Sequence, residues 1–212
     1  MKTIHIDEMK TAQALEQLSK VIMEGGLVCV PFNSSYRIVA NLTDAKAVTK
    51  LLQSKRRTSK APSLVFIQDD EMLRQVSGKR PPQADILAKE MWPGNITLLL
   101  PANPNLPGKV IKQLCKANGK LGVRIPDDEL ALKLLRKTQK PLLVSSANKE
   151  KRAGAGSPAQ IRKTFRASVD IFVDAGDLQP HESSTVVDFQ DGKYVVTRPG
   201  AVSESDIHKL FS

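Results

Sequence analysis

Short apolar runs alternate along the chain with stretches in which apolar residues recur every three or four positions. The short runs are rich in Val, Ile and Leu, and several are bounded by Gly, Pro or Asn, which is typical of buried strands. They predict strands at residues 27–31, 63–67, 96–100, 121–125, 142–146, 171–173, 185–189 and 194–197. The amphipathic stretches predict helices at residues 11–24, 43–52, 72–91 (interrupted at Gly78 and Pro81), 110–115, 127–135, 157–165 and 204–211.

The predicted strands and helices alternate, which is typical of an α/β fold. The last two strands are joined at Asp191-Gly192, a dipeptide that favours a tight antiparallel hairpin. A length of 212 residues with 41% hydrophobic residues suits one globular domain with a sizeable core. We therefore predict a single α/β domain over residues 1–212, with a twisted, mixed sheet flanked by helices.

The charge balance points to a polyanionic ligand. The chain has 32 Lys and Arg residues against 22 Asp and Glu residues, a formal net charge of +10. Such an excess is typical of proteins that bind nucleotides or nucleic acids. An aromatic content of only 4% argues against a surface that stacks single-stranded bases.

The remaining composition argues for a cytoplasmic protein. Cys29 and Cys115 lie far apart in apolar surroundings, so we expect buried free thiols in a reducing compartment. The three histidines are scattered and suggest neither a metal cluster nor a catalytic triad. The N-terminal residues lack the apolar core of a signal peptide, and no apolar run is long enough to span a bilayer.

A basic turn follows the second predicted helix. It carries Lys55, Arg56, Arg57 and Lys60, and no acidic residue occurs between positions 44 and 69. Cations near a helix end have some structural value, and a solvated basic face is the simplest interpretation of the run taken alone. The same cluster could hold phosphate oxygens.

Other polar groups occur where apolar strands run or end. Arg124 lies inside an apolar strand, so it either pairs with a carboxylate or faces an anion. Ser145, Ser146 and Asn148 follow a buried strand, where they could bind a substrate oxygen or simply cap a turn. Neither a P-loop nor a G-x-G-x-x-G fingerprint occurs, which excludes both of these nucleotide-binding classes by motif.

Taken in order, these segments resemble the YrdC family, which comprises the threonylcarbamoyl-AMP synthases and their paralogues. Each motif alone is weak, but the ordered set extends from about residue 12 to residue 201 and is highly specific. The motifs are Lys55-x-Arg57, Trp92-Pro93-Gly94, Gly122-Val123-Arg124-Ile125-Pro126-Asp127, Ser146-Ala147-Asn148 with Ser157-Pro158, Ser184-Thr185-Val186-Val187-Asp188, and Arg198-Pro199-Gly200.

The resemblance implies a concave α/β fold with a basic cavity and nucleotidyltransferase activity. ATP, L-threonine and bicarbonate would be converted to threonylcarbamoyl-AMP and pyrophosphate, with Mg²⁺ present. The product would pass to a downstream threonylcarbamoyl transferase for threonylcarbamoyladenosine modification of tRNA, and tRNA or double-stranded RNA would be a further partner. The chemistry fits, because nucleotidyl transfer mainly needs cations around a triphosphate and aligned reactants.

The resemblance also implies roles for individual residues, and it assigns neither a catalytic acid or base nor a metal ligand. The residues expected to bind ATP are Lys55, Arg57, Ser146, Asn148 and Arg198. The residues expected to bind the other substrates are Ser34, Tyr36, Arg124, Ser145 and Ser184.

The chain departs from the family in the amino-acid half of the expected site. The family motif Pro-Thr-[Asp/Glu]-Thr-x-Tyr-Gly-Leu reads PFNSSYRI here, so Phe32, Asn33 and Arg37 replace a hydroxyl, an acid and a glycine. Phe66 stands where many members have His. Two hypotheses remain: a synthase, or a non-catalytic or re-purposed paralogue that binds RNA or nucleotide. If Phe32 and Phe66 fill the cavity, they would exclude threonine and favour the non-catalytic or re-purposed paralogue. If they pack in the core, the synthase hypothesis remains open.

Overall fold

The computed structural model describes residues 1–32, 35–55, 63–115, 118–147, 157–179 and 182–211. The chain divides into two compact units. The first unit comprises residues 1–59 and 128–181, and the second comprises residues 60–127 and 182–212. Each unit is therefore built from two separate segments of the chain.

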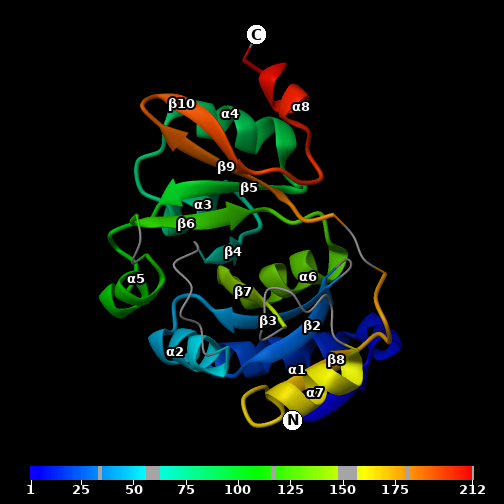
Figure 1. Ribbon diagram of the computed structural model, residues 1–212. Helices are drawn as coiled ribbons and strands as arrows, with labels where there is room; N and C mark the ends of the chain where they lie inside the picture. Colours follow the sequence, from blue (N-terminus) through cyan, green and yellow to red (C-terminus); the bar gives the residue numbers. More distant parts are fainter. Residues whose placement is uncertain (33–34, 56–62, 116–117, 148–156, 180–181, 212) are drawn as a thin grey trace. The chain divides into compact units, whose positions relative to one another are not determined.

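The first unit contains a mixed sheet with the strand order β1-β8-β2-β3-β7 (Figure 1). β1 and β2 each pair with β8 in parallel, whereas β3 pairs with β2 and with β7 in antiparallel fashion. Helix α1 packs against α6, and α2 packs against β3. The strands are β1 (Lys2–His5), β2 (Val28–Phe32), β3 (Ser35–Asn41), β7 (Leu142–Ser146) and β8 (Ile171–Asp174). The helices are the 3₁₀ helix η1 (Ile6–Lys10), α1 (Ala12–Met23), α2 (Ala45–Ser54), α6 (Glu129–Thr138) and α7 (Pro158–Phe165).

Local sequence signals explain where the first helix begins and ends. The Thr11 side chain accepts a hydrogen bond from the amide of Ala14, which is the N-cap arrangement. At the other end, Gly25 has a φ of +80°, which favours glycine. The amides of Gly25 and Gly26 donate to the carbonyls of Ile22 and Val21, respectively. The helix therefore ends at the Gly-Gly pair, with Gly25 in the left-handed conformation.

The second unit contains a mixed sheet with the order β4-β6-β5-β9-β10 (Figure 1). β4 and β6 are parallel, as are β5 and β9, whereas β5 with β6 and β9 with β10 are antiparallel. The strands are β4 (Leu64–Phe66), β5 (Ile96–Pro101), β6 (Lys120–Arg124), β9 (Thr185–Gln190) and β10 (Lys193–Arg198). The helices are α3 (Asp70–Val76), α4 (Pro82–Met91), α5 (Gly108–Leu114) and α8 (Glu204–His208).

The hairpin between β9 and β10 turns at the predicted dipeptide. Asp191 and Gly192 have φ angles of 50° and 73°, the left-handed values that a two-residue hairpin turn requires. The β9–β10 register shifts between Val196 and Arg198. This bulge changes the direction of the strand immediately before Arg198.

The predicted α/β class and the mixed sheets flanked by helices are confirmed. Two strands were not predicted. β1 lies in a polar sequence of which Ile4 is the buried residue, and β3 lies between the predicted strand at residues 27–31 and the predicted helix at residues 43–52, where no element was predicted. The predicted closing helix at residues 204–211 ends at His208. The single domain over residues 1–212 and the basic cavity stay predictions.

Other expectations concern the thiols and the membrane. Cys29 and Cys115 are buried and free, as predicted, and burial raises the pKa of both thiols. Among the described residues, no helix has the length and apolar character needed to cross a membrane.

Candidate functional site

Seven of the ten predicted site residues lie in the described part of the chain, divided between the two units. Arg57, Ser34 and Asn148 lie outside it. The first unit contains Lys55, Tyr36, Ser145 and Ser146, and the second contains Arg124, Ser184 and Arg198.

Lys55 and Ser146 come together in the first unit. Lys55 follows α2, and its Nζ donates a hydrogen bond to the backbone carbonyl of Ser146 at the end of β7. The same ammonium group lies 5.8 Å from the centroid of the Phe165 ring on α7, within range of a cation–π interaction. Ser145 and Ser146 are partly exposed, whereas the preceding residues of β7 are buried. Two predicted ligand-binding residues that lie 91 positions apart are therefore neighbours.

Arg37 lies beside this pair. The β3–β7 register places Arg37 directly opposite Ser146. Directly opposed residues of antiparallel strands point to the same face of the sheet. The residue that replaces the family's glycine therefore adds a cation next to a predicted ATP-binding residue.

Tyr36 is buried and its hydroxyl is used within the fold. The hydroxyl donates to the carbonyl of Gly176 at 2.8 Å and accepts from the amide of Ala175 at 2.9 Å. The ring stacks on Phe172, with 5.1 Å between ring centroids. Burial raises the pKa of Tyr36. These contacts fasten β3 to the turn after β8, and a role of Tyr36 in substrate binding stays a prediction.

In the second unit, Arg124 lies at the buried end of β6. Its Nη2 donates to the Oδ1 of Asn95, the residue immediately before β5. The guanidinium carbon lies 5.7 Å from the centroid of the Phe66 ring, and the β4–β6 register pairs the same two residues. Phe66 therefore packs against Arg124, one of the residues expected to bind the substrates other than ATP. Phe32 and Phe66 are each only 4% exposed.

Ser184 and Arg198, which were predicted to contact substrates, are also brought together. Arg198 Nη2 donates to the carbonyl of Ser184 and, at 3.1 Å, to its Oγ. The Ser184 Oγ is 2.9 Å from the Oγ1 of Thr97 on β5. Arg198 as a residue is exposed, but its guanidinium lies against Ser184, and this local desolvation lowers the pKa of Arg198. The group remains charged at neutral pH, because an arginine pKa lies far above it.

Close backbone packing explains the glycine of the Arg-Pro-Gly motif. The amide of Ala201 donates to the carbonyl of Ser183 at 2.9 Å, so the segment after β10 runs against the segment that carries Ser184. A Cβ atom at Gly200 would lie 2.7 Å from the carbonyl carbon of Ser184 and from the nitrogen of Thr185. Only glycine fits this approach without a shift of the backbone.

Sequence reasoning missed two polar residues at these groups, Asn95 and Thr97. Asn95 closes the Trp-Pro-Gly turn, and Thr97 is the polar residue in the apolar run of β5. The sequence signal that could have identified Thr97 is the one that identified Arg124, namely a polar side chain inside a buried strand.

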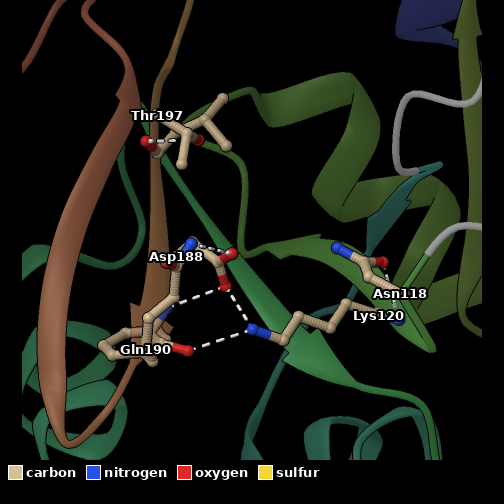
Figure 2. A network of polar contacts seen from close by, with 7 residues as sticks. Asn118, Lys120, Asp188, Gln190 and Thr197 are labelled. Carbon is tan, nitrogen blue, oxygen red and sulfur yellow. Dashed lines mark hydrogen bonds and ion pairs between the residues drawn. The ribbon is translucent and has the colours of Figure 1, made fainter.

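Sequence reasoning also missed an ion pair between Lys120 on β6 and Asp188 on β9 (Figure 2). The Lys120 ammonium also donates to the carbonyl of Phe189 at 3.0 Å. Burial alone would raise the pKa of Asp188, but hydrogen bonds from Lys120, from the Gln190 side chain and from the Phe189 amide outweigh it and hold the pKa below its usual value. β5 lies between β6 and β9 in the sheet, so this pair connects two strands that are not neighbours.

Comparison with known proteins relates the whole arrangement to one family. The model of the family named Sua5, YciO and YrdC, described as telomere recombination, matches residues 20–200. The chain is 31% identical over 189 residues to the threonylcarbamoyl-AMP synthase of Pyrococcus abyssi, an alignment that covers 89% of this chain and 54% of the relative. The chain spans little more than half the length of the curated synthases of P. abyssi and Bacillus subtilis, 54% and 58% respectively.

Solved structures agree in fold. The crystal structure of P. abyssi Sua5 complexed with L-threonine matches with a TM-score of 0.82 at 28% identity, covering 99% of this chain and 60% of that one. The crystal structure of Escherichia coli YciO matches with a TM-score of 0.78 at 22% identity, covering 95% of this chain and 96% of that one.

Proposed function

We propose that this chain, which belongs to the Sua5/YciO/YrdC family, is a threonylcarbamoyl-AMP synthase, a nucleotidyltransferase. The observation that carries the proposal is the match over 99% of the chain to the Sua5 structure with bound L-threonine. The similarity to a named synthase over 89% of the chain supports the same activity.

The proposed reaction joins three substrates in two bond-forming events. The amine of L-threonine combines with bicarbonate to give a carbamate and water. A carbamate oxygen then attacks the α-phosphorus of ATP, and the bond from this phosphorus to the oxygen that bridges to the β-phosphorus breaks. The products are threonylcarbamoyl-AMP and pyrophosphate. Because negative charge is concentrated on the phosphates, cations and hydrogen-bond donors around them are the main contribution expected from the protein.

The side chains of this chain offer such groups. We assign ATP binding to Lys55, Arg57, Ser146, Asn148 and Arg198, and binding of the other substrates to Ser34, Tyr36, Arg124, Ser145 and Ser184. The contact between Lys55 and Ser146 supports assigning both residues to ATP, and the contact between Ser184 and Arg198 supports adjacent positions for the two ligands. Arg124 would bind the threonine carboxylate, since a guanidinium pairs well with a carboxylate.

Mg²⁺ would arrive with ATP. No cluster of three or more His, Cys, Asp or Glu side chains able to hold a metal ion occurs among the described residues. Mg²⁺ is commonly bound by substrate phosphates with one or two carboxylates, so the reaction does not require a metal cage made by the protein. The ion would neutralise charge on the triphosphate.

The adenylate is a reactive intermediate, so a second enzyme must consume it. We propose that a threonylcarbamoyl transferase passes the group to tRNA, and that both reactions take place in the cytoplasm. The net charge of +10 is compatible with direct contact to tRNA.

Pyrophosphate release from ATP by the purified protein tests the proposed activity. We expect release that requires both L-threonine and bicarbonate, together with threonylcarbamoyl-AMP detected by mass spectrometry. Omission of either substrate is the control. A protein that binds ATP or RNA but releases no pyrophosphate under any of these conditions would contradict the proposal and favour the non-catalytic paralogue.

A further inference from the structure

Three polar side chains from separate strands or their ends form a hydrogen-bonded row in the second unit. Thr97 lies on β5, Ser184 immediately precedes β9, and Arg198 ends β10. The Ser184 Oγ lies 2.9 Å from Thr97 Oγ1 and 3.1 Å from Arg198 Nη2. Thr97 and Ser184 are buried, whereas Arg198 is exposed. The row therefore runs from the core of the unit to its surface.

Packing fixes the direction of the Thr97 hydroxyl. A Cβ atom at Gly122 on the neighbouring strand β6 would lie 3.1 Å from the Thr97 methyl carbon. The methyl group thus occupies the space above Gly122. A β-branched side chain has few rotamers, so a fixed methyl also fixes the hydroxyl, here toward Ser184.

The chemistry of the groups decides where the protons lie. A guanidinium only donates, so Arg198 occupies one lone pair of the Ser184 oxygen. The bond between the two hydroxyls can run in either direction by distance alone. If Ser184 donated, the proton of Thr97 would be left buried without an acceptor, since within the described part of the chain Thr97 Oγ1 is hydrogen-bonded to Ser184 alone. One of the two protons must find its acceptor outside the pair, and Ser184, which lies beside the exposed Arg198, is the hydroxyl that a ligand oxygen can reach. An unsatisfied buried donor is costly, so Thr97 donates to Ser184 and Ser184 donates outward.

This direction determines what Ser184 can do. With both lone pairs of its oxygen filled by Thr97 and Arg198, the remaining function of the hydroxyl is to donate its own proton. We infer that Thr97 is a positioning residue that makes Ser184 a dedicated hydrogen-bond donor to an anionic substrate oxygen beside Arg198. The oxygen belongs to a phosphate of ATP or to the carboxylate of L-threonine. The inference deepens the proposed function and rests on it for the identity of the two ligands.

A double-mutant cycle on Thr97 and Ser184 tests the inference. Thr97→Val keeps the methyl group over Gly122 and removes the hydroxyl, Thr97→Ser keeps the hydroxyl, and Ser184→Ala removes the donor. Binding of ATP and of L-threonine is measured separately by titration calorimetry, and turnover by pyrophosphate release. We expect Thr97→Val to weaken binding of one ligand by about tenfold, the size of one lost hydrogen bond. Thr97→Ser should retain most of the wild-type affinity. The ligand whose binding is weakened, ATP or L-threonine, is the one whose oxygen accepts the hydrogen bond from Ser184.

The decisive result is non-additivity. If Thr97 acts through Ser184, Thr97→Val has no further effect in the Ser184→Ala background. Thr138→Val is the matched control: Thr138 is also 4% exposed like Thr97, but its hydroxyl donates to the carbonyl of Leu134 in its own helix, so ligand binding should stay unchanged. Circular dichroism spectra establish that each variant is folded.

Each other outcome has a defined meaning. Equal losses from Thr97→Val with and without the Ser184 hydroxyl, or no rescue by Thr97→Ser, would overturn the role of Thr97 and leave the proposed synthase intact. A wild-type chain that binds its ligands without turnover would overturn the synthase, and the binding cycle would still decide the role of Thr97. Absence of binding of both ligands to the wild-type chain would overturn both.

Discussion

At the scale of single residues, the two phenylalanines that depart from the family motif are part of the packed interior. Phe32 ends β2, a strand in which every residue is buried, and Phe66 lies against Arg124. The low exposure of both rings agrees with the hypothesis that they pack in the core, and the alternative that they fill the substrate cavity is tested by the Phe32→Thr variant below. Packing in the core is the arrangement in which the enzyme hypothesis survives.

We expect Phe32→Thr to lower the free energy of unfolding by roughly 3 kcal/mol, because the change leaves a cavity and buries a hydroxyl. Urea denaturation measures the loss. Phe189→Thr, at a partly exposed ring on β9, is the control and should cost less. If Phe32→Thr kept full stability and raised threonine-dependent pyrophosphate release, the ring would instead be blocking a substrate pocket.

Lys55 offers a second test at this scale. We expect Lys55→Ala to weaken ATP binding by about tenfold or more, the equivalent of one charge-assisted hydrogen bond. The Lys55→Ala substitution should leave the circular dichroism spectrum unchanged, because Lys55 follows the end of α2 and is not buried. Lys46→Ala, at an exposed position of the same helix, should leave ATP affinity unchanged. Equal affinity of the Lys55 and Lys46 variants in titration calorimetry would exclude Lys55 from the ATP site.

At the scale of elements, the β9–β10 hairpin positions two of the candidate site residues of the second unit, Ser184 just before it and Arg198 at its end. The left-handed turn at Asp191-Gly192 sets its register, and the bulge after Val196 directs Arg198 onto Ser184. The Lys120–Asp188 pair then connects β9 to β6 across the intervening strand β5. A turn, a bulge and an ion pair thus hold the segment that positions the proposed ligand-binding side chains.

We expect Asp188→Asn to lower the free energy of unfolding at pH 7 by about 1–3 kcal/mol, since a mostly buried carboxylate loses charge-assisted hydrogen bonds. The folded-state pKa of Asp188 is depressed from its ordinary value of 3.8, so its contribution is present above that value and is lost as the pH falls through the depressed pKa. The difference between wild type and variant in urea denaturation should therefore vanish in acid.

Asp7→Asn is the control for this titration, because the Asp7–Lys10 pair is exposed to solvent. Exposed ion pairs contribute little, so its unfolding free energy should match the wild type at every pH. A constant difference between wild type and Asp188→Asn down to low pH would show that the carboxylate charge is not what stabilises the hairpin.

At the scale of the whole molecule, neither unit is a continuous piece of chain. The first is interrupted by residues 60–127, and the second by residues 128–181. β3 and β7 pair in the first unit, and residues 60–127 lie between them in the sequence. If the second unit unfolded, residues 60–127 would become a long flexible loop between these two paired strands. The entropy of closing that loop couples the stability of the two units, which favours the single domain expected from the sequence.

We expect a single thermal unfolding transition. Trp92 is the one tryptophan of the sequence and lies in the second unit, so its fluorescence reports that unit, whereas far-UV circular dichroism reports both. Coincident midpoints by the two probes would support one cooperative domain. A fluorescence transition that precedes or follows the circular dichroism transition would establish two independently unfolding units.

The sequence by itself determined the elements, because the interactions that define them are local. The apolar run at residues 142–146 became β7 with the same bounds, the helix predicted at residues 43–52 is α2 with Asp44 as its N-cap, and the hairpin turns at Asp191-Gly192. The short strand β1 escaped prediction because pairing with β8, a partner distant in sequence, stabilises it more than its own composition does. The order of the motifs was enough to identify the family.

Only the tertiary structure decided which polar side chains meet. Lys55 contacts Ser146 over 91 positions, and Ser184 contacts Thr97 over 87 positions. Such pairs depend on strand order, register and one bulge, which arise from packing of distant segments rather than from any local pattern. For this reason the sequence identified Ser184 as a candidate, and the fold was needed to find Thr97 beside it and to infer the direction of the hydrogen bond between them.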